Sequence, residues 1–181
     1  MKRFIYYTLS GWLLITSAHS SLVYNRVQVQ RGAHVFMLHC SGCHSLRYMR
    51  YIRLSDDLGF KNRSYKPILS SLSAAQARSW FGREPPDLSL IAQETGQKWL
   101  RLYLQGFYPD QHKPFGVNNY IQPDVAMPDV FSGLNLRDQQ QAIEDVLAFL
   151  DYTAKPERGV SYSIGIVTVI FILLFMFLRI S

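Results

Sequence analysis

The sequence lacks the features of several common protein classes. Its 181 residues include two cysteines, too few for a small domain held together by several disulfides. No internal repeat is visible, and no stretch shows the strict apolar–polar alternation of a convincing strand. Hydrophobic residues make up 48% of the chain, which excludes a disordered protein. The length allows one hydrophobic core but not two full domains.

A concentrated positive charge is also missing. The formal net charge is +6, but residues 21–158 carry 16 Lys and Arg against 13 Asp and Glu, so this segment is only +3. The spacing of Arg47, Arg50 and Arg53 predicts one face of a helix and not a basic cluster. Because a nucleic-acid-binding protein concentrates its positive field, we expect no nucleic acid among the partners.

The first 20 residues have the pattern of a secretory signal peptide. A basic start is followed by an apolar run over residues 4–15 and by small residues up to Ser20, after which we expect cleavage. An uncleaved anchor is the alternative, but this run is shorter than the ~20 apolar residues that a spanning helix needs. We therefore predict an exported protein.

Residues 160–178, near the C-terminus, form a longer apolar run without any charge. These 19 residues are just long enough to cross a bilayer as a helix. A buried helix of a globular domain is the alternative, but this helix would be apolar on every face. We expect a transmembrane anchor in the lipid bilayer at 160–178, preceded by a linker at 154–159 and an exported domain at 21–153.

Helices and loops dominate the predicted domain. Helical periodicity is found over residues 28–39, 73–82, 88–105 and 138–152. Gly96 marks a break in the third of these stretches, and Asp138 is the expected N-cap of the last. Residues 106–135 form a long irregular stretch, which in a small domain is uncommon unless it wraps around something. The expected fold class is mainly α with long loops.

Both cysteines lie in one short motif, Cys40-Ser41-Gly42-Cys43-His44, directly after the first predicted helix. A disulfide that closes so small a loop would add little stability. A thioredoxin-like dithiol needs a strand setting and a helix N-terminus, and a zinc site needs further ligands at a spacing that this chain does not show. All three alternatives leave His44 without a role.

Covalent haem attachment uses both cysteines and the histidine. The thiols of Cys40 and Cys43 would form thioethers with the haem vinyl groups, and the adjacent His44 would be the proximal ligand of the iron. An apolar haem would also replace much of the core that a loop-rich domain lacks. Methionine is a common second ligand. Of the five methionines, Met127 is best placed to reach the other face of the haem, and His112 is the rival.

Four blocks of sequence occur in a fixed order, and one of them contains the cysteine motif. They are RGAHVFMLHCSGCHSLRYMRY, WFGREPPDLSLIA, YLQGFYPD and FGVNNYIQPDVAMP. This set resembles the cytochrome c1 family, the haem subunits of cytochrome bc1 complexes, over residues 31–178. The resemblance implies a class I cytochrome c-like haem domain with long loops, followed by one C-terminal transmembrane helix.

The resemblance also implies residue roles. It assigns the functions described above to the two cysteines, His44 and Met127, with one covalently attached haem c per chain. Pro85 and Pro86 would lie against the haem, where a carbonyl would accept a hydrogen bond from His44 Nδ1. Many relatives have a propionate-binding arginine where this chain has Thr95, so another basic group or water would take its place.

The function implied by the resemblance is electron transfer. The subunit would pass electrons from a Rieske iron–sulfur protein to a cytochrome c within a ubiquinol:cytochrome c oxidoreductase, beside cytochrome b. It would not be an enzyme on its own, and its haem domain would face the periplasm at a bacterial inner membrane. One alternative is a membrane-anchored monohaem cytochrome c that feeds a terminal oxidase, which would lack the PPDLS and GVNN blocks. The other is an exported thiol oxidoreductase, whose thiols would be free.

Overall fold

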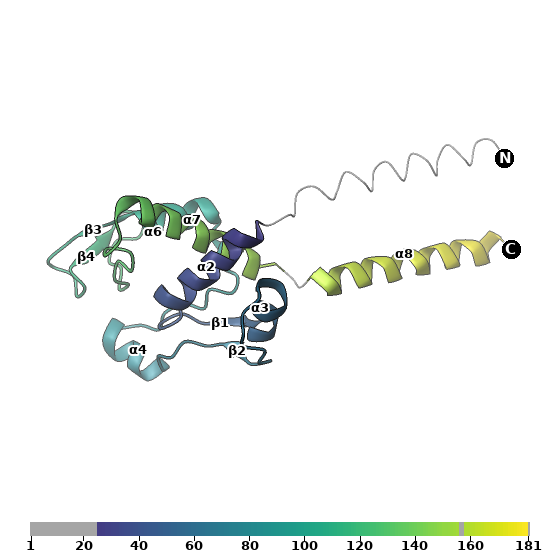
Figure 1. Ribbon diagram of the computed structural model, residues 1–181, viewed down its shortest axis with the longest axis horizontal. Helices are drawn as coiled ribbons and strands as arrows, with labels where there is room; N and C mark the ends of the chain where they lie inside the picture. Colours follow the sequence, from purple (N-terminus) through teal and green to yellow (C-terminus); the bar gives the residue numbers. More distant parts are fainter. Residues whose placement is uncertain (1–24, 156–157, 181) are drawn as a thin grey trace.

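The computed structural model describes residues 25–155 and 158–180, with side chains described for 25–155 and 165–176. The predicted signal peptide, residues 1–20, lies outside the described residues. Helices predominate, as predicted, and α2 and α7 lie at the centre of the domain (Figure 1). The elements are, in chain order, α2 (Arg26–His39), β1 (Leu46–Arg50), α3 (Tyr51–Leu58), β2 (Pro67–Ile68), α4 (Ala74–Phe81), α5 (Ile91–Glu94), α6 (Gln97–Gln105), β3 (Phe107–Pro109), β4 (Val117–Asn119), α7 (Leu136–Thr153) and α8 (Arg158–Ile180).

Helices α2 and α7 make the most extensive contact between any two elements. Helix α2 begins after Asn25, whose side-chain oxygen accepts a hydrogen bond from the backbone N–H of Gln28 at 3.2 Å. Gly32 allows the two helix backbones to approach closely, because a Cβ at this position would lie 1.8 Å from the backbone oxygen of Asp145 in α7. The absence of a side chain at Gly32 therefore sets the distance between the two helices.

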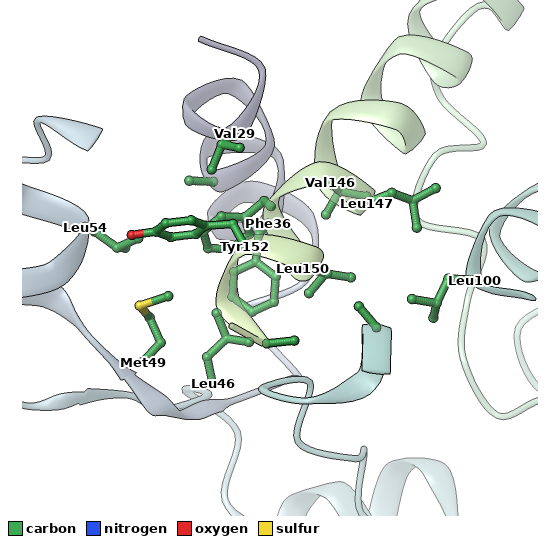
Figure 2. Packing of buried hydrophobic residues seen from close by; sticks show 14 of the residues in the cluster. Val29, Phe36, Leu46, Met49, Leu54, Leu100, Val146, Leu147, Leu150 and Tyr152 are labelled. Carbon is green, nitrogen blue, oxygen red and sulfur yellow. The ribbon is translucent and has the colours of Figure 1, made fainter. Parts of the chain in front are cut away.

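The hydrophobic core surrounds this helix pair (Figure 2). Phe36 of α2 and Phe149 of α7 are fully buried, and their ring centroids lie 5.6 Å apart. Leu46 and Met49 of β1 and Leu54 of α3 are buried in the same cluster. Burying a side chain of this size stabilises the fold by about 1.5–3 kcal/mol. The core thus holds β1 and α3 against the two long helices.

Two ion pairs join α7 to its neighbours. Arg31 of α2 donates to both carboxylate oxygens of the buried Asp145, at 2.7 and 2.9 Å. Arg101 of α6 donates in the same way to Glu144, at 2.6 and 2.7 Å. Such bidentate pairs fix orientation as well as distance. Adjacent residues of α7 therefore orient α2 and α6, the two helices on which the site is built.

Four short strands correct the expectation of a domain without strands. Strand β1 pairs antiparallel with β2, and β3 pairs antiparallel with β4. In the second pair Phe107 lies opposite Asn119, and Pro109 lies opposite Val117. The strands are two to five residues long, too short for an alternating pattern to show in the sequence. The stretch predicted as irregular, residues 106–135, thus begins with a hairpin.

Two local predictions were wrong. Arg47 and Arg50 lie in β1 and Arg53 lies in α3, so the three do not share one helical face. Helix α7 begins earlier than predicted, because Asn135 is its N-cap and accepts a hydrogen bond from the backbone N–H of Asp138 at 3.0 Å. Asp138 lies instead in the first turn, where a negative charge favours the helix dipole.

The predicted break at Gly96 is confirmed. Gly96 separates α5 from α6 and has a φ of 80°, which glycine adopts without strain. The short helix predicted at residues 73–82 is also present as α4, with Ser73 and Gln76 forming a capping box.

Helix α8 covers the predicted anchor without interruption. Its described side chains, residues 165–176, are exposed, and the helix lies apart from the domain in Figure 1. In the part of the chain that the structure describes, no helix meets the length and apolarity needed to cross a membrane.

Candidate functional site

A cavity of about 590 Å³ lies between the end of α2, the proline-containing loop 83–88, helix α6 and the loop 122–131. Most of the side chains that line it are apolar, and Val146 and Leu150 of α7 form part of its wall. Cofactor pockets usually enclose about 300–1,000 Å³ and combine an apolar lining with a few polar groups. The cavity therefore has the size and character that an apolar cofactor such as haem requires.

The cysteine motif forms one wall of this cavity. Helix α2 ends at His39, and the backbone then turns, with the N–H groups of Cys43 and His44 both donating to the carbonyl of Cys40, at 3.1 and 2.8 Å. Both cysteines and His44 line the cavity, and no disulfide joins the two cysteines. The turn thus brings two thiols and an imidazole to the same side of one apolar space.

The ring of His44 is oriented by a hydrogen bond. Its Nδ1 lies 2.8 Å from the backbone oxygen of Pro86, and because a carbonyl only accepts, Nδ1 carries the proton. The Nε2 lone pair is then free to bind a metal. Burial lowers the pKa of His44, against the opposing effects of the Pro86 hydrogen bond and the charge of Asp87. A neutral, oriented imidazole is the form that ligates iron.

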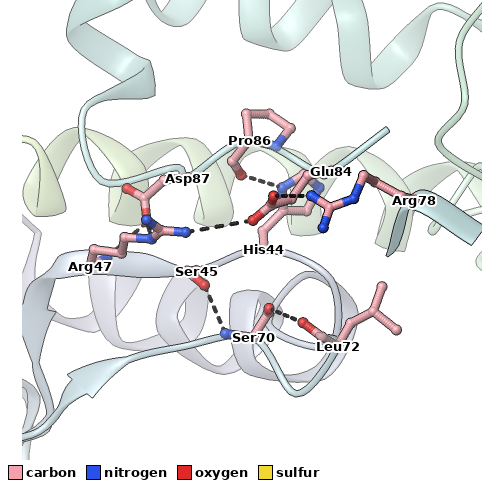
Figure 3. Close-up of polar contacts among 9 residues, drawn as sticks. All are labelled: His44, Ser45, Arg47, Ser70, Leu72, Arg78, Glu84, Pro86 and Asp87. Atoms are coloured by element: carbon pink, nitrogen blue, oxygen red, sulfur yellow. Dashed lines mark hydrogen bonds and ion pairs between the residues drawn. The ribbon is translucent and has the colours of Figure 1, made fainter. Parts of the chain in front are cut away.

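The Pro86 carbonyl is held in place by contacts on its own loop (Figure 3). Asp87 accepts a hydrogen bond from the backbone N–H of Arg47 at 2.9 Å, and the backbone N–H of Leu88 donates to the carbonyl of Ser45 at 2.9 Å. These bonds fasten the loop to the segment that directly follows the cysteine motif. These two bonds therefore tie the loop to the motif.

Met127 lines the cavity from the loop that follows the β3–β4 hairpin. Its sulfur accepts a hydrogen bond from the hydroxyl of Tyr103 in α6 at 3.6 Å. Burial raises the pKa of Tyr103, so the phenol keeps its proton at neutral pH and acts as the donor. A thioether sulfur has a further lone pair, which stays available to a metal. His112, the rival ligand, lies on an exposed turn and does not line the cavity.

Two asparagines shape the loop that carries Met127. Buried Asn119 donates from its amide to the carbonyl of Tyr103 at 2.7 Å, and its side-chain oxygen accepts from the backbone N–H of Ile121 at 2.9 Å. The side-chain oxygen of Asn118 accepts from the backbone N–H of Asp124 at 3.0 Å. The Val-Asn-Asn strand therefore folds the following loop back over α6, toward the cavity.

The two thiols do not have the lowered pKa that is typical of reactive cysteines. Burial raises the pKa of Cys40 to about 12, and the charge of Cys43 adds to this effect. Burial also raises the pKa of Cys43. Redox-active cysteines have a lowered pKa and commonly sit at helix N-termini, whereas Cys40 follows the C-terminus of α2. Both groups are therefore protonated at neutral pH.

The structure brings all six predicted site residues to this one cavity: Cys40, Cys43, His44, Pro85, Pro86 and Met127. Thr95 also lines it, but its hydroxyl donates to the carbonyl of Ile91 at 2.8 Å and supplies no positive charge. Sequence reasoning missed Tyr103 and Arg83, which line the cavity as well. The signal for Tyr103 was its helical spacing from Trp99, on which it stacks, but such spacing is equally typical of core aromatics.

A helical domain in which a CxxCH motif, an oriented histidine and a methionine line one apolar cavity is typical of the c-type cytochromes. Comparison with known proteins identifies the particular family. The model of the Cytochrome C1 family matches residues 17–79 and 69–181. The chain therefore belongs to the cytochrome c1 family.

Individual relatives differ in how much of their length is matched. Cytochrome c1 of Allochromatium vinosum is 40% identical over 131 residues, which cover 66% of this chain and 53% of that protein, so the match spans about half of the relative. The ammonia monooxygenase gamma subunit of Nitrosomonas europaea is 28% identical, with 82% of this chain and 77% of that protein covered. A solved structure, the "Hyperthermophilic respiratory Complex III", aligns at 20% identity with a TM-score of 0.47, covering 84% of this chain and 71% of that chain.

Proposed function

We propose that this chain is the electron-transfer subunit of a ubiquinol:cytochrome c oxidoreductase and carries one covalently attached haem c. The observation that carries the proposal is the meeting of the CxxCH motif and Met127 at one cavity, in a chain of the cytochrome c1 family. When bound, the haem supplies the one-electron chemistry. The subunit is a redox carrier and not an enzyme on its own.

Each predicted residue has a defined task in this proposal. Cys40 and Cys43 would hold the haem through thioether bonds, and His44 and Met127 would ligate its iron. The carbonyl of Pro86 keeps the His44 ring in one tautomer, since it accepts a hydrogen bond from Nδ1–H. Pro85 and the apolar side chains around the cavity exclude water from the site.

Partners and location follow from the same proposal. The subunit takes electrons from a Rieske iron–sulfur protein, passes them to a cytochrome c, and assembles with cytochrome b. Its haem domain lies on the periplasmic side of a bacterial inner membrane, with residues 160–178 as a single anchor in the bilayer. The charge-free sequence of this segment and its continuous helix support the anchor, and the pattern of residues 1–20 supports export.

The position of Cys40 after the C-terminus of α2, where burial raises the pKa of both thiols, argues against the rival function of a thiol oxidoreductase. The second rival, a monohaem cytochrome that feeds a terminal oxidase, would lack the PPDLS and GVNN blocks. In this chain the two blocks fasten the loops of Pro86 and Met127.

Purification from membranes in mild detergent tests the proposal. We expect a chain that stains for haem under denaturing conditions and co-purifies with a cytochrome b and a Rieske protein. The double substitution Cys40→Ser and Cys43→Ser removes the stain. A haem-bearing chain that always purifies alone would overturn the assignment to a complex, and a chain without covalent haem would overturn the cytochrome assignment itself.

The assignment of Met127 as an iron ligand has its own test. Met127→Leu keeps the covalent haem but loses the long-wavelength absorption band that a methionine sulfur gives to ferric haem. Met37→Leu is the matched control, because Met37 packs on the core from α2 and does not line the cavity. Retention of the band in Met127→Leu would show that another residue binds the iron.

A further inference from the structure

We propose that Arg83 binds a carboxylate of the haem and forms a cationic subsite at the rim of the cavity. The inference rests on the proposed function, because it assigns a role to one residue of the same site. A haem is apolar except for its propionate groups, which carry negative charge. Among the cavity-lining residues that the structure describes, Arg83 is the only Lys or Arg, and it is exposed at the rim.

The charge of Arg83 is not compensated by a carboxylate. Its neighbours Arg47 and Arg78 both face Glu84, at 3.7 and 3.5 Å. Asp124, the acidic residue beside Arg83, pairs through its side chain with Lys113. Within residues 25–155, Arg83 takes part in no ion pair. The cation is therefore available to an anionic group in the cavity.

Arg83 connects two loops of the site: its own loop, which contains Pro86, and the loop that contains Met127. It precedes Pro85 by two residues and donates from Nη2 to the backbone oxygen of Asp124 at 3.1 Å, in the loop of Met127. A guanidinium carries several N–H donors, so this bond leaves others for a ligand. The positive charge also acts on the phenol of Tyr103, inside the cavity, where it opposes the rise in pKa caused by burial.

Among the described residues of the lining, Arg83 is the one side chain that is a cation at every physiological pH. The remaining ionisable side chains of the cavity are the cysteine motif, Tyr103, His39 and Glu84, and Glu84 is already shared by two arginines. Thr95 is neutral and bonded to its own helix. A carboxylate that enters a largely apolar cavity is costly without a cation or donors beside it. Arg83 meets this need from the chain itself.

Loss of Arg83 has a predictable electrostatic effect. A nearby cation lowers the pKa of a carboxylate and offsets its charge. Without the cation, the propionate charge favours the ferric state, so the midpoint potential falls. The propionate pKa rises at the same time, so the pH range over which the potential varies moves to higher pH.

The test uses the full-length, haem-loaded chain with Arg83→Gln, Arg83→Lys and Arg63→Gln. We expect Arg83→Gln to lower the midpoint potential and to shift its pH dependence upward, Arg83→Lys to restore most of both, and Arg63→Gln to leave both unchanged. Arg63 is the control, because the substitution removes the same charge from an exposed ion pair with Asp56, and neither residue lines the cavity.

The outcomes separate this inference from the proposed function. A wild-type chain without covalent haem defeats the proposed function. A haem-loaded Arg83→Gln variant with the wild-type potential and pH profile overturns the Arg83 inference alone. An Arg83→Gln variant that only lowers thermal stability would also overturn the inference, since Arg83 would then have a structural role alone, as a contact between two loops.

Discussion

Helix α7 borders two regions that differ in how they are filled: its packed contact with α2, and the cavity of the candidate site. On one side of α7, Phe149 packs against Phe36 of α2, and Gly32 brings the two backbones into close approach. On an adjacent side of the same helix, Val146 and Leu150 line a cavity of about 590 Å³. The comparison teaches that one region is completed by side chains and the other, in our proposal, by a haem. Substitutions in the first should change stability, and those in the second should change the properties of the haem.

The largest effect is expected from Gly32→Ala, in the filled region. The new Cβ would lie 1.8 Å from the backbone oxygen of Asp145 and 2.8 Å from Cβ of Phe149, so the helices must separate. We expect a loss of about 3 kcal/mol or more in the free energy of unfolding, measured by chemical denaturation of the haem-loaded chain. Gly133→Ala is the control, because a Cβ there meets nothing within 4 Å. Equal stability of the two variants would contradict the close approach.

Asp145→Asn should destabilise the same interface by a smaller amount. The side chain of Asp145 is 3% exposed and holds Arg31 by two hydrogen bonds. We expect a loss of about 1–2 kcal/mol, since hydrogen bonds to charged groups are lost while Arg31 can turn to water. Glu144→Gln changes the next residue, whose side chain is 44% exposed, and should cost less than about 1 kcal/mol. An equal loss in both variants would show that burial does not decide the strength of these pairs.

Tyr103→Phe tests a residue of the cavity, and there the properties of the haem should change more than the stability. We expect stability to change by less than about 1 kcal/mol. The midpoint potential should fall, because Met127 sulfur without its hydrogen-bond donor binds ferric iron more strongly. Redox titration and the methionine–iron absorption band measure the effect. Tyr108→Phe is the control, since Tyr108 stacks on Tyr120 and does not line the cavity. An unchanged midpoint potential in Tyr103→Phe would show that the hydroxyl of Tyr103 does not influence the proposed iron ligand Met127.

The smallest effect is expected outside both regions. Arg63 and Asp56 form an exposed ion pair at 3.0 Å, with side chains 66% and 53% exposed. Arg63→Ala should change the free energy of unfolding by less than about 0.5 kcal/mol and leave the haem spectrum unaltered. A loss of more than that in thermal or chemical denaturation would show that stability is not concentrated in the α2–α7 region.

The six predicted site residues meet at one cavity, whereas part of the local structure around them was predicted wrongly. The helices at residues 28–39 and 138–152 were recognisable because their apolar residues repeat at the helical period. The strands were not, because pairing across the chain forms them and each is too short to show a period. Arg47 and Arg50 were therefore assigned to a helix from their spacing alone. In the structure, the pairing of β1 with β2 overrides that spacing.

By itself the sequence determined the features that neighbouring residues form together: the CxxCH motif, the main helices and the charge-free segment 160–178. The tertiary structure alone decided which distant groups serve the motif. Pro86, the acceptor for His44, lies 42 residues away in the chain, and Tyr103 lies 24 residues from Met127. Such contacts depend on loops that are brought together only when α2 packs on α7. The physical reason is that bonds between neighbours follow from chain geometry, whereas contacts between distant residues follow from packing.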